Sequence, residues 1–171
     1  EKDGKKVKHI ILKAPAGQGK STFCRKLVHI WCSVQKKKLN ILSDDGMSNK
    51  SETSGLKDED EMLRFDVLLY ICLRDISNEK TLMDVVCTQF PLCESEGLSH
   101  NCHIEALILQ AEENKVLLII DGLDEMDNSS PFIEKIMKKR LYPNITVLAT
   151  TRPWKIGQVS LIKTAQIAVL L

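Results

Sequence analysis

The sequence predicts an α/β fold, a three-layer sandwich in which a mostly parallel sheet lies between two layers of helices. Short apolar runs alternate along the chain with segments of helical periodicity, which is the pattern of strands joined by crossover helices. The aliphatic run at residues 116–120 suits a strand that is buried on both faces. A length of 171 residues, of which 43% are hydrophobic, is enough for one domain with its own core.

The first half of the chain is expected to begin with a strand at residues 7–14, which leads into a glycine-rich loop. An amphipathic helix follows at residues 20–38, because apolar residues recur there three or four positions apart, at Phe23, Leu27, Ile30, Trp31 and Val34. The lysines at 36–38 close this helix, where positive charge favours the helix dipole. Residues 43–61 are predicted to form a mobile acidic loop, because Ser, Gly, Asp and Glu predominate there.

The second half is expected to supply three further strands, at residues 65–76, 115–126 and 144–154, the last of them stopped by Pro153. Helices are predicted at residues 79–90, 103–114 and 131–142, and Pro131 opens the last of these. Residues 160–171 predict part of a fifth strand. Because an apolar end of this kind needs a cover, we expect the sequence to continue in a longer protein.

The charge and composition of the chain argue against two classes of partner. A formal net charge of +1 gives no general reason to expect nucleic acid or an anionic membrane, and no apolar run approaches the roughly 20 residues that span a bilayer. Four of the six cysteines lie in apolar-periodic segments, namely Cys24, Cys32, Cys72 and Cys87. They are predicted to be small buried hydrophobic residues in a reduced, cytoplasmic protein.

A cluster of cysteine and histidine residues occurs in the connection between the helices predicted at 79–90 and 103–114 and at the start of the second of them. Cys93, His100, Cys102 and His103 are four potential zinc ligands. Their spacing matches no standard zinc finger, so a polar connecting loop is the favoured interpretation.

The loop at residues 14–22 reads A-P-A-G-Q-G-K-S-T and lies between a predicted strand and a predicted helix, the arrangement that binds phosphate. Gly17 and Gly19 let the backbone curve around phosphates, and Lys20 adds a fixed positive charge. Ser21 offers a hydroxyl group to Mg²⁺, and Thr22 reaches the α-phosphate. Ala14 stands where the pattern usually begins with glycine, but this position needs compactness more than a positive φ, so the loop is expected to function. The predicted nucleotide-binding residues are Ala16, Gly17, Gln18, Gly19, Lys20, Ser21 and Thr22.

Acidic residues follow the strand predicted at 115–126, and ligands of parallel sheets bind beyond such strand ends. Asp121 is the candidate ligand of Mg²⁺, together with Ser21. Gly122 stands where many ATPases have a glutamate that orients water, and acids recur only at Asp124 and Glu125. Hydrolysis is therefore expected to be slow or to depend on neighbouring domains. A solvated turn residue is the alternative for Glu125. Arg152, at the end of the fourth predicted strand, is a candidate sensor of the γ-phosphate.

The three segments "APAGQGKST", "LLIIDGLDE" and "LATTRPW" resemble, in this order, the NACHT domain of NOD-like receptor ATPases. That family belongs to the STAND branch of the P-loop NTPases, which is related to the AAA+ fold. The resemblance extends from about residue 8 to the end and implies that residues 1–171 form a single nucleotide-binding domain. Ala14 and the long acidic segment at 43–61 depart from the family pattern, and the family's helical and winged-helix parts do not follow.

By this resemblance the protein would be a molecular switch in innate immune signalling that binds ATP or ADP with Mg²⁺. Asp124, Glu125 and Arg152 would serve slow hydrolysis, and Ser21 and Asp121 would hold the metal. The expected partners are other copies of the full-length protein, an upstream effector domain and a downstream sensor domain.

The sequence leaves three alternatives to the switch. A scaffold that binds nucleotide without hydrolysing it remains open because of Gly122. A P-loop kinase for a small molecule would need an acceptor pocket and an arginine-bearing lid, and residues 65–115 contain a single arginine, Arg74. DNA handling, as in some AAA+ relatives, is the weakest alternative, because with a net charge of +1 and 5% aromatic residues the sequence offers no basic groove.

Overall fold

A sheet of five parallel strands is the centre of the computed structural model, which describes residues 9–43, 57–76, 81–89, 106, 108–111, 115–125, 131–138, 140–156 and 166–169. The strands are β1 (His9–Lys13), β2 (Val67–Cys72), β3 (Val116–Asp121), β4 (Thr146–Thr151) and β5 (Gln166–Val169). They lie in the order β2-β3-β4-β1-β5, and every pair is parallel. All five carboxyl ends therefore meet at one edge. The predicted fold class is confirmed.

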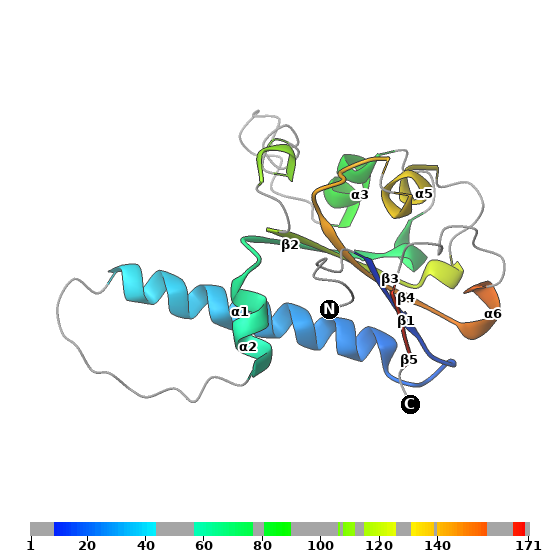
Figure 1. Ribbon diagram of the computed structural model, residues 1–171, viewed down its shortest axis with the longest axis horizontal. Helices are drawn as coiled ribbons and strands as arrows, with labels where there is room; N and C mark the ends of the chain where they lie inside the picture. Colours follow the sequence, from blue (N-terminus) through cyan, green and yellow to red (C-terminus); the bar gives the residue numbers. More distant parts are fainter. Residues whose placement is uncertain are drawn as a thin grey trace.

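Helices cover both faces of this sheet (Figure 1). One face carries α1 (Lys20–Ser43) and α2 (Lys57–Leu63), and the other carries α3 (Leu82–Gln89) and α5 (Pro131–Met137). A short helix, α6 (Pro153–Ile156), follows β4, and 3-10 turns follow β2 and β3 as η1 (Leu73–Asp75) and η3 (Leu123–Glu125). None of the helices that the structure describes is long and apolar enough to cross a membrane.

Two predictions for the first layer of helices are corrected. Helix α1 continues past the three lysines to Ser43, so these lysines do not close it. Residues 57–61 belong to α2 rather than to an acidic loop, while residues 44–56 lie outside the described part of the chain. The helix forms in this acidic sequence because Met62 is buried against α1 and β3. The indole N–H of Trp31 also donates to the carbonyl oxygen of Phe65 at 2.9 Å, which ties the end of this segment to α1.

The remaining predicted strands and helices agree with the sequence in kind where the structure describes them, and β2, β3, β4 and α5 are shorter than predicted. Strand β2 ends at Cys72 and β3 ends at Asp121, where 3-10 turns take over. Strand β5 occupies residues 166–169 of the segment expected to hold part of a fifth strand. Within the helix predicted at 103–114, the described residues 106 and 108–110 are helical.

The core is divided by the sheet into two clusters, because the side chains of β3 point alternately to its two faces. All six residues of β3 and all six of β4 are buried. Leu118 and Ile120 pack with α3 and α5 on one face, whereas Leu117 and Ile119 pack with Cys24 of α1 and Met62 of α2 on the other. Burial on both faces explains why the run at 116–120 contains no polar residue.

Candidate functional site

The loop between β1 and α1 begins at Ala14, whose side chain is completely buried. Its N–H donates to the carbonyl oxygen of Thr151 at 3.2 Å, which continues the contact between β1 and β4. The residue lacks a positive φ, as the sequence argument required. A small apolar residue without a positive φ therefore suits this position.

The two glycines of the loop are required for their backbone conformation. Gly17 has a φ of +78° and Gly19 a φ of +75°, a region that side-chain-bearing residues rarely adopt. A Cβ placed on either glycine would meet no other protein atom within 4 Å. Within the protein, conformation rather than lack of space therefore selects glycine at these two positions.

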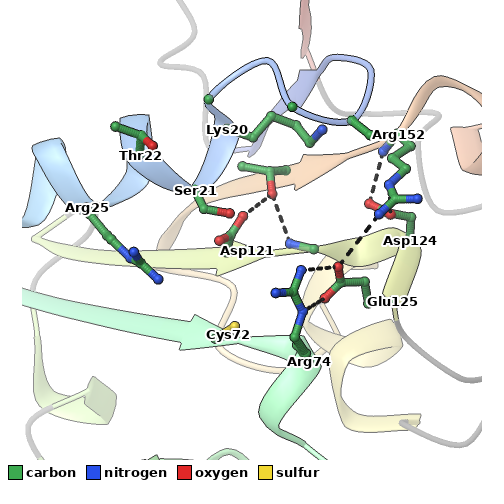
Figure 2. Close-up of a pocket in the computed structure, with 15 residues that line it drawn as sticks. Lys20, Ser21, Thr22, Arg25, Cys72, Arg74, Asp121, Asp124, Glu125 and Arg152 are labelled. Carbon is green, nitrogen blue, oxygen red and sulfur yellow. Dashed lines mark hydrogen bonds and ion pairs between the residues drawn. The ribbon is translucent and has the colours of Figure 1, made fainter.

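Lys20, the first residue of α1, lies over the loop. Its ammonium group donates to the carbonyl oxygens of Ala14 at 2.8 Å and Pro15 at 2.7 Å. The next residue, Ser21, turns its hydroxyl toward the carboxylate of Asp121 at the end of β3 (Figure 2). The start of α1 and the end of β3 thus bring a cation, a hydroxyl and a carboxylate to the same edge of the sheet.

Asp121 is held by hydrogen bonds to both of its carboxylate oxygens. The hydroxyl of Thr150 donates to Oδ1 at 2.5 Å, and the hydroxyl of Tyr70 donates to Oδ2 at 3.2 Å. Thr150 also accepts a hydrogen bond from the N–H of Gly122 at 2.9 Å. Burial, together with the charge of Asp121, raises the pKa of Tyr70 to about 12, so its phenol remains a proton donor at neutral pH. A carboxylate has roughly four acceptor positions, so two remain for a cation.

The acid pair in η3 is bound by two arginines. Asp124 accepts from the Nε of Arg152 at 2.9 Å and from the backbone N–H of Arg152 at 3.0 Å. Glu125 accepts from the Nη2 of Arg74 at 2.6 Å and from the Nε of Arg74 at 3.1 Å. The Nη2 of Arg152 lies 4.0 Å from Oε1 of Glu125. The hydrogen bonds to Glu125 and the negative charge of Glu125 raise the pKa of Arg74 above its usual value. The two acids thus position arginines at the edge of the sheet.

These groups surround one cavity of about 310 Å³. The cavity is lined by Ala16, Gly17, Gly19, Lys20, Ser21, Thr22, Arg25, Cys72, Arg74, Asp121, Gly122, Asp124, Glu125, Thr150 and Arg152. Of the residues predicted from the sequence, Gln18 is exposed and is not among those that line it. The cavity places the other predicted site residues together.

Five residues that line the cavity were not predicted from the sequence as site residues: Arg25, Cys72, Arg74, Gly122 and Thr150. Arg25 follows Ser21 by four positions on α1, so helical periodicity alone would have placed it on the same face. Cys72 and Arg74 follow from strand order, because β2 lies beside β3 and pairs Cys72 with Asp121. Nothing in the sequence shows that these two strands are neighbours.

The cysteines differ in their surroundings, and this corrects one prediction. Cys24 is fully buried, as expected, but Cys32 in α1 is exposed and Cys72 is half-buried. The side chain of Cys87 and the cluster at residues 93–103 lie outside the described residues. Among the residues that are described, no group of three or more His, Cys, Asp or Glu side chains has the arrangement of a metal site.

Cys24 and Cys32 are expected to react very differently with thiol reagents. Burial, and to a lesser degree the charge of Asp121, raises the pKa of Cys24 to about 12. At pH 8 roughly one molecule in ten thousand would then carry the reactive thiolate. Peptide mapping after brief alkylation of the native protein should find Cys32 modified and Cys24 intact. Denaturation should equalise the two, and equal labelling before denaturation would contradict the burial of Cys24.

The family model of the NACHT domain matches residues 53–169. The matched range runs from before α2 to β5, so it contains Asp121, the acid pair and Arg152, whereas the loop between β1 and α1 precedes it. No curated protein matches the chain.

Proposed function

The chain belongs to the NACHT domain family, and on that premise we propose that it is an ATP- and ADP-binding switch of a NOD-like-receptor-type signalling protein. A NACHT domain is a nucleotide-binding module of the P-loop NTPase class. The observation that carries the finer proposal is that Lys20, Asp121 and Arg152, from three separate parts of the chain, line one cavity.

The phosphate groups of a nucleotide are proposed to lie between the loop and the start of α1. The cavity volume of about 310 Å³ is at the lower end of the range for small-molecule sites. Gly17 and Gly19 hold the loop in a curve whose N–H groups join those at the start of a helix of 24 residues, where anions are stabilised. Lys20 adds a positive charge that can exchange its two carbonyl partners for phosphate oxygens.

Ser21 and Asp121 fit the role of magnesium ligands. In phosphate sites this ion uses one or two carboxylates together with water and substrate oxygens, so a larger cluster of acids is not needed. Bound there, the ion would neutralise phosphate charge. Thr150 and Tyr70 orient the carboxylate of Asp121 by donating to its two oxygens, which leaves its remaining acceptor positions for the ion.

Arg152 is the proposed sensor of the terminal phosphate, since its guanidinium lines the cavity and is held there by Asp124. A triphosphate and a diphosphate can shift a conformational equilibrium only through contacts that differ between them. Asp124 and Glu125 are the candidates for slow hydrolysis. The proposed partners are further copies of the full-length cytoplasmic protein, an upstream effector domain and a downstream sensor domain, in innate immune signalling.

A non-hydrolysing scaffold is the second candidate, and one observation favours it. Asp124 and Glu125 both accept hydrogen bonds from arginines, so neither carboxylate is free to act as a base in this arrangement. If hydrolysis by Glu125→Gln equals that of the unchanged protein, the scaffold is the better description. Phosphate transferred to an acceptor other than water would instead favour a kinase.

The proposal is tested by calorimetric titration of the 171-residue chain with ADP and with a slowly hydrolysed ATP analogue, each with Mg²⁺. Lys20→Ala removes charged hydrogen bonds to phosphate and should weaken binding of both nucleotides by about a hundredfold. Lys26→Ala is the matched control, because Lys26 is an exposed lysine of the same helix that does not line the cavity. Equal binding by all three proteins would refute the proposed site.

A further inference from the structure

Arg74 and Glu125 form an ion pair at the rim of the cavity. Arg74 lies in the turn after β2, Glu125 lies in the turn after β3, and two parallel hydrogen bonds of 2.6 and 3.1 Å join their side chains. Figure 2 shows the carboxylate of Glu125 between the guanidinium groups of Arg74 and Arg152. Both members of the pair line the cavity that also holds Lys20 and Asp121.

The geometry of the pair allows Arg74 to exchange Glu125 for another anion. The side chain of Arg74 is 71% exposed, whereas that of Glu125 is 24% exposed. Ion pairs at such an exposed position contribute little net stability, because water competes for both partners. The planar fork of an arginine matches a carboxylate and a phosphate equally well. A phosphate group that enters the cavity can therefore compete with Glu125 for Arg74.

Gly122 places Glu125 in this position. The backbone there has a φ of +90°, and the N–H of Glu125 donates to the carbonyl oxygen of Gly122 at 2.8 Å, which turns the chain back over the end of β3. A Cβ on Gly122 would lie 3.2 Å from Oε2 of Glu125, so the carboxylate rests in the space that glycine leaves open. The same turn keeps Oε1 of Glu125 within 4.0 Å of Nη2 of Arg152.

We propose that Glu125 is an internal counterion for Arg74, and that the terminal phosphate of a nucleoside triphosphate displaces it and binds Arg74 in its place. The inference rests on the proposed nucleotide site and adds to it a second arginine that distinguishes triphosphate from diphosphate. Glu125 then lowers the affinity for triphosphate, since the phosphate must compete with a carboxylate that is already bound.

The test is the ratio of the dissociation constant of ADP to that of a non-hydrolysable ATP analogue, measured with Mg²⁺ on the 171-residue chain. Glu125→Gln keeps the size of the side chain but removes its charge, so the ratio should rise by about tenfold. Arg74→Ala should lower the ratio below that of the unchanged protein. Arg74→Lys keeps the charge without the fork and should give an intermediate value.

The double variant Arg74→Ala with Glu125→Gln distinguishes two explanations for a higher ratio. One is the release of Arg74 from Glu125, and the other is the loss of a negative charge near the phosphate. If Glu125 acts through Arg74, the double variant should have the ratio of Arg74→Ala alone. A rise of similar size in the absence of Arg74 would overturn the inference, because the loss of any nearby negative charge would then explain it. Arg64 and Glu61 form an exposed pair at 3.3 Å outside the cavity, so Arg64→Ala and Glu61→Gln are matched controls that should leave the ratio unchanged.

Failure of this inference and failure of the proposed function give different results. Ratios that stay constant across the series, while both nucleotides bind in a manner that depends on Lys20, would overturn the exchange alone. Absence of binding by the unchanged protein would overturn the nucleotide site and the exchange together.

Discussion

Asp121→Asn is expected to remove the effect of magnesium on nucleotide affinity. When the ion is present, the affinity for nucleotide should fall by at least about tenfold. Asp121 is 5% exposed and is the carboxylate that faces Ser21 across the cavity. Asparagine has nearly the same shape and can still accept a hydrogen bond from Thr150 or Tyr70, but it carries no charge to bind a divalent ion. Titrations with ADP, in excess Mg²⁺ and in excess chelator, measure this effect.

The control for this variant is Asp60→Asn, which removes an exposed carboxylate from α2 without touching the cavity. Its affinity for ADP should respond to magnesium as that of the unchanged protein does. If Asp121→Asn also keeps the full response, the metal must be held by other groups, and the assignment of Asp121 is wrong.

Leu118→Ala is expected to lower the free energy of unfolding by about 2–5 kcal/mol, since it leaves a cavity at the centre of β3. Leu118 is completely buried and packs against α3 and α5. The loss is a large part of the roughly 5–15 kcal/mol that stabilises most domains. Urea denaturation measures this change in the free energy of unfolding. Leu39, which is 65% exposed on α1, supplies the control, because Leu39→Ala should change stability by less than about 0.5 kcal/mol. Equal effects would contradict the central position of β3.

The sheet and the main site residues could be predicted because their causes are local in the sequence. An unbroken aliphatic run predicts β3, and the carboxyl end of a parallel strand predicts the position of Asp121. The loop from Ala14 to Ser21 has backbone requirements that its own residues meet. In both cases a short segment carries the information.

The features that the sequence did not predict depend on contacts between segments that are distant in the sequence. Helix α2 was missed because acidic residues predominate in it, while the burial of Met62 and Phe65, which stabilises this region, becomes visible only once α1 lies beside it. Arg74 was missed as a site residue because its pairing with Glu125 follows from the neighbouring positions of β2 and β3. Sequence periodicity identifies strands but not their order in a sheet.

The position of β1 has a consequence for biosynthesis. Among the described strands, β1 pairs with β4 and β5, both of which come near the end of the chain. During translation the phosphate loop therefore leaves the ribosome long before the strands that hold it. Pairing between segments so distant in sequence also slows folding. A nascent chain that stops before β4 would contain every residue of the loop and both β2 and β3, but β1 would have neither of its neighbouring strands. Nucleotide can therefore stabilise the site only once β4 has been added.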